Sequence, residues 1–557
     1  MKVMKKKELF ITLIFAVLLT GCIHDCITDP PAGGNTITIT AGLPGESAST
    51  DMPGTRIALK ESGLNVNLTW EVGDQIYLVL TQGGAYKDKQ TYTLTADDIS
   101  DDKKKAVFTL SLAKIADGNF NLYGVYGGEG LDGTDPTKAK LPLAEHSRSS
   151  SLDSLQKNKG IMLTFAKPEL TKPLTSLSVN FEHIGSLFRI LVKNTAETSL
   201  NDVNSATLTA DDNLPVYCND GNDTYDLDGV DGGRFTSVGS NSLSFAPISS
   251  SNIVSGGILA FWAWFPVQKE QTWQELKLTV GGKTTEGTTS DKTGVTVGKA
   301  YHFYATHNGT TLSFAGSTDI TVAAGKLADF RDGNLYNTVE IKRDDSTQTW
   351  MKENLAYLPS VVAKATGSED SGLESNAYYY VYGNTSTDVA TAKATTNYTT
   401  YGVLYNWTAA MAGAASSNER PSGIRGACPN GWHLPSDAEW KQLERALGML
   451  LTETNKTGNR GTDQGGQMKA TGNTTDVTGL WTYPNTGASN SSYFTGLPGS
   501  FRNSDNTESG VGDQCYYWCS TLDGSDAWYR GLYYNHALVH RNKGTKAYGF
   551  SVRCVKD

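Results

Sequence analysis

The chain has 557 residues, of which 58 are glycine, 38% are hydrophobic and 19% are charged. This length exceeds what a single core holds and indicates three or four domains, and the composition is typical of β-sheet domains joined by turns. The formal net charge of −10 excludes the basic surface that a nucleic-acid partner requires, so we expect no nucleic-acid binding.

Residues 1–21 are predicted to be a lipoprotein signal peptide. A lysine-rich start precedes the apolar run Leu9–Leu19, which is too short to span a membrane and suits a signal-peptide core. The run ends in Leu19-Thr20-Gly21-Cys22, which resembles the bacterial lipobox and implies acylation of Cys22 and a lipid anchor in the outer membrane. An ordinary signal peptide that happens to contain a cysteine is the alternative. Export would allow disulfides among the six other cysteines, Cys26, Cys218, Cys428, Cys515, Cys519 and Cys554.

Short strands separated by turn residues follow. Residues 22–56 combine a polar tether with the alternating strand Thr36–Thr40, and apolar residues then alternate along Leu64–Trp70, so that one face of a sheet is apolar. Further strands at this spacing predict a first β-sandwich over residues 57–168. They are Gln75–Leu80, Ala106–Leu112 and Asn121–Tyr126.

A second run of strands predicts another β-sandwich over residues 169–312, in which His183 is a packed strand residue. Small polar residues near 309–320 form a linker, after which tryptophan and tyrosine become dense. We expect a third domain over residues 319–557. The strands of the second sandwich are Leu177–His183, Leu187–Val192, Ile258–Phe265, Leu276–Val280 and Val297–Phe303.

Motifs of the first two domains resemble the fimbrillin, or type V pilin, family of surface lipoproteins: TRIAL at Thr55–Leu59, followed in order by LTWEVGDQIYL, VNFEHIGSLFRILV and VTVGKAYHFY. The resemblance implies that a trypsin-like protease cuts after Arg56 and releases Thr36–Thr40 as an edge strand. A strand of another pilin subunit would then fill the exposed groove. In the alternative interpretation, Arg56 is an ordinary surface arginine.

From about residue 319 the chain resembles the Fibrobacter succinogenes major paralogous domain, in the motifs YGVLYNWTAAM, CPNGWHLPSDAEW, GLPGSFRN, YYWCST and YGFSVRCV. This resemblance implies an α+β fold related to C-type lectins and a disulfide between Cys428 and Cys554. The predicted fold class is therefore mainly β, with two fimbrillin-like sandwiches followed by a lectin-like domain.

One helix is predicted from its own residues. Ser436 and Glu439 have the spacing of a capping box, which satisfies the first backbone donors of a helix. Trp440, Leu443 and Leu447 fall at helical spacing and are expected to face a sheet. Lys441, Glu444 and Arg445 are expected on the exposed side.

No catalytic, phosphate-binding or metal-ligand motif is found in the sequence, so we predict a protein that is not an enzyme and that takes no metal or cofactor. The one enzymatic alternative is the formylglycine-generating type, with Cys515 and Cys519 as its reactive pair. Four residues apart on one strand, these cysteines are too distant to bond to each other without a turn.

Aromatic rings are the candidate ligand contacts, because they can stack on sugars or anchor a protein. The hypothesis is a pilus tip or accessory adhesin, surface-exposed on the outer membrane or at a fimbrial tip. It would assemble with other pilin subunits by strand exchange and bind a glycan or protein through the lectin-like domain. The alternative is a lipid-anchored glycan- or protein-binding lipoprotein that does not polymerise. The candidate contacts are Trp481, Trp518, Trp528, Tyr529, Tyr533 and Tyr534.

Overall fold

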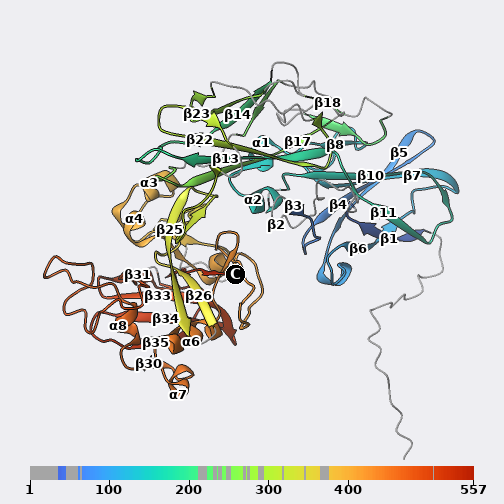
Figure 1. Cartoon of the computed structure of the whole chain (residues 1–557). Coiled ribbons are helices and arrows are strands. Elements are labelled where there is room, and N and C mark those ends of the chain that lie inside the picture. The colour runs from blue at the N-terminus through green and yellow to red at the C-terminus, as the bar shows by residue number, and fades with distance from the viewer. Residues whose placement is uncertain are drawn as a thin grey trace, which may run out of the picture.

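The computed structural model arranges the chain as three units along an arc (Figure 1). None of the helices in the described part of the chain is both long and apolar enough to cross a membrane. The residues that the structure describes are 35–44, 60–62, 65–157, 159–210, 223–229, 235, 241–245, 252–267, 271–272, 276–285, 294–315, 319–343, 346–363, 375–505 and 507–557.

The first unit is a sandwich of a three-stranded and a five-stranded sheet around one core. The smaller sheet has the order β11(Ser176–Asn180), β1(Thr36–Gly42), β6(Lys105–Ser111). The larger has the order β12(Glu182–His183), β10(Met162–Lys172), β7(Gly118–Gly127), β4(Gln75–Gln82), β5(Ala85–Thr93). The hairpin β2(Lys60–Ser62) and β3(Asn65–Asn67) and the 3-10 turn η1(Ala96–Asp98) complete it.

The second unit also pairs a five-stranded with a four-stranded sheet. The first has the order β23(Leu312–Phe314), β22(Ala300–His307), β13(Gly185–Asn194), β17(Ile258–Pro266), β9(Arg148–Ser149), and the second β16(Ser242–Ser244), β14(Ala206–Ala210), β19(Leu276–Val280), β20(Lys283–Thr284). Two short ribbons and two helices border it: β8(Lys138–Lys140) with β15(Thr224–Asp226), β18(Gln271–Thr272) with β21(Gly294–Val295), α1(Ala144–Ser147) and α2(Leu152–Lys157).

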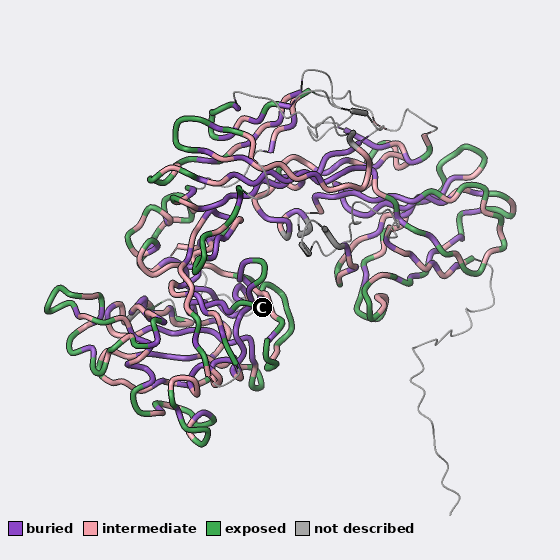
Figure 2. Tube along the Cα trace, in the orientation of Figure 1, coloured by how far each residue is buried: buried purple, intermediate pink, exposed green. Residues whose placement is uncertain are grey.

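Strand β17 joins the first two units because both of its faces are buried. Its residues are all apolar, ILAFWAWFP, and none is exposed. Side chains alternate across a strand, so Trp262 and Trp264 pack into the core of the first unit while Phe261 and Phe265 pack into that of the second. Figure 2 shows this central stretch as continuously buried. A strand with two apolar faces must lie between two cores.

The third unit is built around β33(Gln514–Asp523), which separates two cores. Its main sheet runs β27(Tyr379–Tyr380), β28(Leu404–Tyr405), β36(Phe550–Ser551), β33, β34(Asp526–Tyr533), β35(Val539–Gly544), β30(Gly458–Arg460), with β31(Gly499–Arg502) and β32(Glu508–Val511) alongside. A second sheet runs β24(Lys326–Asp329), β25(Asn334–Arg343), β26(Ser346–Met351), β37(Val555–Lys556), β29(Trp432–His433). The helices are α3(Val389–Lys393), α4(Thr396–Tyr401), α5(Trp407–Met411), α6(Asp437–Ala446), α7(Leu451–Thr454) and α8(Gln464–Met468).

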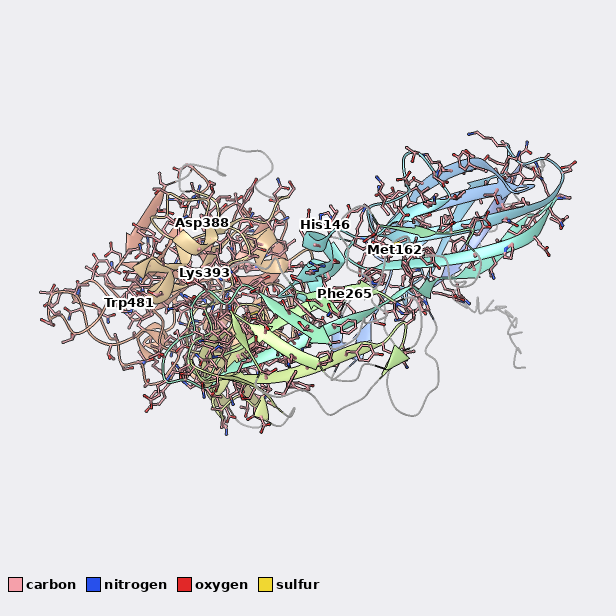
Figure 3. All side chains as sticks on the ribbon, turned by 90° about the horizontal axis from the view of Figure 1, so that it is seen from above. His146, Met162, Phe265, Asp388, Lys393 and Trp481 are labelled. Atoms are coloured by element: carbon pink, nitrogen blue, oxygen red, sulfur yellow. A yellow bond between two sulfur atoms is a disulfide. The ribbon has the colours of Figure 1, made fainter. Side chains whose placement is uncertain are left out.

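The second unit lies between the other two. Figure 3 shows Phe265 of the second unit between Met162 of the first and Trp481 of the third. The second and third units meet where the Ala260 amide donates to the Phe330 carbonyl at 2.6 Å.

The mainly β fold class is confirmed, with its helices concentrated in the third unit. The sheets divide at a different place from the predicted boundary between residues 168 and 169. Strands β11 and β12 still belong to the first unit, and the second begins at Gly185, while β9 crosses over to pair with β17. Turn residues mark where strands end, but they do not say which sheet the next strand joins.

Candidate functional site

Strand β1 lies in the middle of its sheet. It pairs antiparallel with β6 over seven residues and parallel with β11 over five, between the two strands as Figure 1 shows. The predicted edge position of this strand is therefore wrong. Its neighbours β6 and β11 come from about 70 and about 140 residues further along the chain, and no local pattern encodes such pairings.

The buried side of β1 is a row of three small or branched apolar side chains. Ile37, Ile39 and Ala41 are at most 1% exposed and belong to the core of the first unit. The backbone is held on both sides. Towards β11 the Thr38 amide donates to the Thr175 carbonyl at 3.0 Å, and towards β6 the Leu43 amide donates to the Lys104 carbonyl at 3.3 Å. Loss of β1 would leave an apolar slot with unpaired backbone donors and acceptors on each wall.

Several predicted sites lie outside the described residues. They are the signal peptide, the acylated Cys22, the cleavage site at Arg56, Cys26 and Cys218. His183 is a packed residue of β12, and burial lowers its pKa to about 4. Within the described chain, no group of three or more His, Cys, Asp or Glu side chains is placed to hold a metal ion.

The predicted disulfide between Cys428 and Cys554 is formed. Both sulfurs are buried in one core of the third unit, where they tie the segment before β29 to the segment before the last strand. The link spans 126 residues. It therefore removes much of the conformational freedom of the unfolded chain.

We predict that replacing both cysteines, Cys428→Ala with Cys554→Ala, lowers the unfolding free energy of the third unit by about 2–4 kcal/mol. Urea unfolding followed by labelling of the Cys515 and Cys519 thiols, resolved by peptide mass spectrometry, measures this unit separately from the others. Reductant should shift the wild-type midpoint by the same amount and leave the variant unchanged. A variant that unfolds at the wild-type midpoint would contradict the prediction.

The predicted capping box at the start of α6 is formed. The Ser436 hydroxyl accepts from the Glu439 amide at 3.1 Å, and the Glu439 carboxylate accepts from the Ser436 amide at 2.9 Å. Trp440 and Leu443 are fully buried as predicted, with Trp440 against Trp350 at a ring distance of 4.7 Å. The box thus sets the start of a helix whose apolar side packs on the sheet.

His433 connects the cap to the C-terminal residue. Its Nε2 lies 2.7 Å from Glu439 Oε1 and its Nδ1 2.8 Å from Asp557 Oδ1. Burial alone would lower the pKa of His433, but the hydrogen bonds and charges of the two carboxylates outweigh it and raise the pKa. The protonated imidazole, which donates from both nitrogens, is the form that this geometry favours.

A pH dependence follows from this raised pKa. Protonation of His433 stabilises the fold fully below the unfolded-state pKa of about 6.5, and this contribution is lost as the pH rises through the higher folded pKa. The stability difference between wild type and His433→Gln should therefore be larger at pH 5.5 than at pH 8.5. Urea unfolding across this range measures it.

His540 provides a control of opposite sign. Burial, together with the charges of His536 and Arg460, lowers the pKa of His540, so its protonation costs stability as the pH falls. The difference between wild type and His540→Gln should decrease towards pH 5.5. Parallel profiles for the two variants would contradict the assignment of His433.

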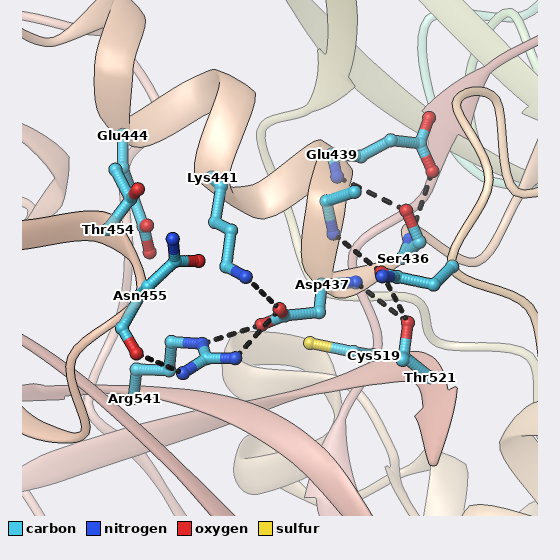
Figure 4. Close-up of polar contacts among 12 residues, drawn as sticks. Ser436, Asp437, Glu439, Lys441, Glu444, Thr454, Asn455, Cys519, Thr521 and Arg541 are labelled. Atoms are coloured by element: carbon cyan, nitrogen blue, oxygen red, sulfur yellow. Dashed lines mark hydrogen bonds and ion pairs between the residues drawn. The ribbon is translucent and has the colours of Figure 1, made fainter. Parts of the chain in front are cut away.

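A buried ion network, partly drawn in Figure 4, lies under α6. Asp437 Oδ1 accepts from Arg530 Nη1 and from Arg541 Nε at 2.8 Å each. Asp437 Oδ2 accepts from Arg541 Nη2 at 2.8 Å and lies 2.8 Å from Lys441 Nζ. Burial would raise the pKa of Asp437, but these cations hold the pKa far below its ordinary value. The carboxylate is therefore ionised in the folded protein.

Glu444 is the second carboxylate of this network. Its Oε1 accepts from Arg530 at 2.6 Å and from Arg460 at 2.7 Å, and the residue is fully buried. The prediction that Glu444 is exposed is wrong. Helical spacing places it away from the apolar stripe, but arginines from two distant strands cover that side of the helix.

Residues 345–556 match the family model described as the Fibrobacter succinogenes major domain. The match covers less than half of the chain. The structural unit begins earlier than the match, because β24 and β25 continue the sheet of β26 and place Leu327, Tyr336 and Ile341 in its cores. No curated protein matches the chain.

The solved structures that resemble the chain each cover about half of it. A proposed cell adhesion protein of Bacteroides uniformis has 13% identity and a TM-score of 0.30, covering 51% of this chain and 97% of its own. The tip fimbrial protein Mfa3 of Porphyromonas gingivalis, with C-terminal truncation, has 9% identity and a TM-score of 0.26, covering 50% of this chain and 98% of its own. The fimbrial anchor protein Mfa2 of the same organism has 10% identity and a TM-score of 0.28, covering 50% of this chain and 95% of its own. At these scores the likeness assigns no function to the chain.

The six aromatic residues predicted as ligand contacts do not form one site. Trp481 and Trp518 are fully buried, and their indole nitrogens donate to the Gly496 and Tyr405 carbonyls. Neither ring is accessible to a ligand. They are packing residues because β33 and its surroundings are buried on both faces, which an alternating pattern alone does not reveal.

The other four rings are half-buried and lie on two faces of β34 and the residue after it. Trp528 and Tyr534 pack against one core, and Trp528 is covered by the Arg541 guanidinium at 3.5 Å. Tyr529 and Tyr533 pack against the other core, each beside the His540 ring. Because the two pairs lie on opposite faces of β34, a ligand bound on one face can contact only the pair on that face.

Cys515 and Cys519 are both unpaired and buried. Burial raises the pKa of Cys515 to about 11, and burial likewise raises the pKa of Cys519. A reactive thiol needs the reverse, a lowered pKa and access to solvent. The structure thus gives no support to the interpretation of this pair as formylglycine-generating cysteines.

Proposed function

We propose that this protein is a bacterial surface adhesin of the fimbrial kind, in which the first unit accepts a strand from another subunit and the third unit binds a surface ligand. The observation that supports the proposal is the central position of β1. Removal of such a strand opens a slot with two hydrogen-bonding walls and an apolar floor. An incoming extended strand can restore both.

The N-terminal processing belongs to the same proposal. Acylation of Cys22 would hold the chain at the outer membrane, and cleavage after Arg56 would free the segment that contains β1. The second unit is followed directly by the third, with eleven residues between the end of β23 and the start of β24. We therefore place the chain at a fimbrial tip, where a subunit accepts a strand and gives none.

The second candidate is a lipid-anchored binding protein that does not polymerise and keeps β1. The fully paired state of β1 in the structure favours it. In both candidates the third unit, proposed to be related to C-type lectins, acts by binding a glycan or protein rather than by catalysis.

Cells that carry the wild-type chain or Arg56→Gln test the proposal. We expect the wild type to appear in sheared fibres together with other subunits, and Arg56→Gln to remain with the membrane fraction. Arg331→Gln is no suitable control because Arg331 is buried with Asp329. The exposed Lys89→Gln in the first unit serves instead. Equal recovery of all chains with membranes would favour the second candidate.

A further inference from the structure

A groove of about 650 Å³ runs along α6 in the third unit. The helix contributes Lys441 and Arg445 to one side, Arg343 at the end of β25 lies on another, and Arg420 reaches in from the loop before the helix. This volume falls within the range of sites for small ligands. None of the six predicted aromatic contacts lines it.

The groove concentrates positive charge. Its described lining includes four cationic side chains and no carboxylate, although the whole chain has a formal charge of −10. Lys441 and Arg445 lie four residues apart on one helix, a like-charge spacing that destabilises a helix. A cluster that costs stability in the free protein has the character of a binding site.

Two of these cations have no counter-ion. Among the described residues neither Arg420 nor Arg445 forms an ion pair, and the buried Nε of Arg445 has no hydrogen-bond partner. Lys441 shares Asp437 with two guanidinium groups. Guanidinium groups bind carboxylate and sulfate through paired hydrogen bonds, so Arg420 and Arg445 can both take an anion.

The protein behind the groove adds to the positive field. The buried network on the inner side of α6 holds three arginines, Arg460, Arg530 and Arg541, against two carboxylates, Asp437 and Glu444. Counting Lys441, the cations outnumber the carboxylates by two. A cleft with low-dielectric walls and one sign of charge focuses its field on an incoming ion.

We propose that this groove binds an acidic carbohydrate, through carboxylate groups of uronic acids or through sulfate groups. Besides the cations, Ser346, Gln442 and Asn455 line it and can hydrogen-bond to sugar hydroxyls. Its apolar lining is limited to Ala438 and the exposed Leu451. A peptide partner would need a deeper apolar anchor site. The inference rests on the proposed binding role of the third unit and is independent of strand exchange.

The test measures binding of the chain from residue 23 to 557 to immobilised polygalacturonate and heparin, with dextran as the neutral polymer. We expect binding to at least one acidic polymer that weakens with salt, and none to dextran. Arg420→Gln with Arg445→Gln should weaken binding at least tenfold. Binding to polygalacturonate alone would assign carboxylate, and to heparin alone sulfate.

The matched control is Lys87→Gln with Lys89→Gln, which removes the same charge from exposed positions in the first unit. This control should bind as the wild type does, and thermal unfolding should show that both variants fold. Equal weakening by both pairs, no effect of the groove pair, or equally strong binding to polyglutamate would overturn the inference. Binding to neutral glycans alone would overturn it while the adhesin proposal stands, whereas failure to bind any glycan or cell surface would count against the adhesin proposal as well.

Discussion

A chain that begins at Ile57 is expected to bind a synthetic peptide of residues 35–44 in a one-to-one complex and to gain thermal stability from it. The reason is the slot that β1 leaves between β6 and β11. The peptide restores hydrogen bonds on both walls and returns Ile37 and Ile39 to full burial. Each isoleucine contributes about 1.5–3 kcal/mol by burial.

Two altered peptides sharpen this experiment. A peptide with Ile37→Asp and Ile39→Asp should bind at least a hundredfold more weakly, since each 1.4 kcal/mol corresponds to a factor of ten. A peptide with Thr38→Ser changes only the outward side of the strand and should bind as the native peptide does. Without peptide, we expect the truncated chain to associate with itself. A truncated chain that stays monomeric, melts at the native temperature and binds no peptide would contradict the role of β1.

The second large effect is expected from Asp437→Asn. This change removes the carboxylate that Arg530, Arg541 and Lys441 share, and leaves buried guanidinium groups without their counter-ion. Breaking a buried ion pair in this way costs about 3–5 kcal/mol. The urea midpoint of the third unit should fall accordingly, measured by labelling of the Cys515 and Cys519 thiols.

An exposed ion pair in the main sheet of the third unit, which also carries Arg530 and Arg541, supplies the control. Lys543 and Asp523 lie 3.1 Å apart, but their side chains are 44% and 49% exposed. Exposed pairs contribute about 0–1 kcal/mol, so Lys543→Gln should hardly move the midpoint. A loss for Asp437→Asn no greater than that for Lys543→Gln would show that the network is not needed for stability.

The features predicted correctly from residue patterns are those encoded within a few positions. The capping box needs only Ser436 and Glu439, and the burial of Trp440 and Leu443 follows from helical spacing. The disulfide between Cys428 and Cys554 was implied by a family resemblance and is formed. Spacing alone gave no reason to choose that pair.

The wrong predictions depend on contacts between distant segments. The central place of β1 is set by strands far along the chain, and Glu444 is buried because Arg460 and Arg530 reach it from other strands. Trp481 and Trp518 match the sequence pattern of a ligand contact as well as that of a packing residue, because aromatic residues serve both roles. The groove has no signature in the sequence, because Lys441 and Arg445 have the spacing of ordinary solvated cations and only the fold places Arg343 and Arg420 beside them.

The measurement that tests the central claim most directly is the N-terminal sequence and intact mass of the protein recovered from native cell surfaces or sheared fibres. Strand exchange predicts a chain that starts at Ile57, with β1 removed. A chain that starts at an acylated Cys22 and retains β1 would contradict assembly by this route and identify a static, lipid-anchored binding protein.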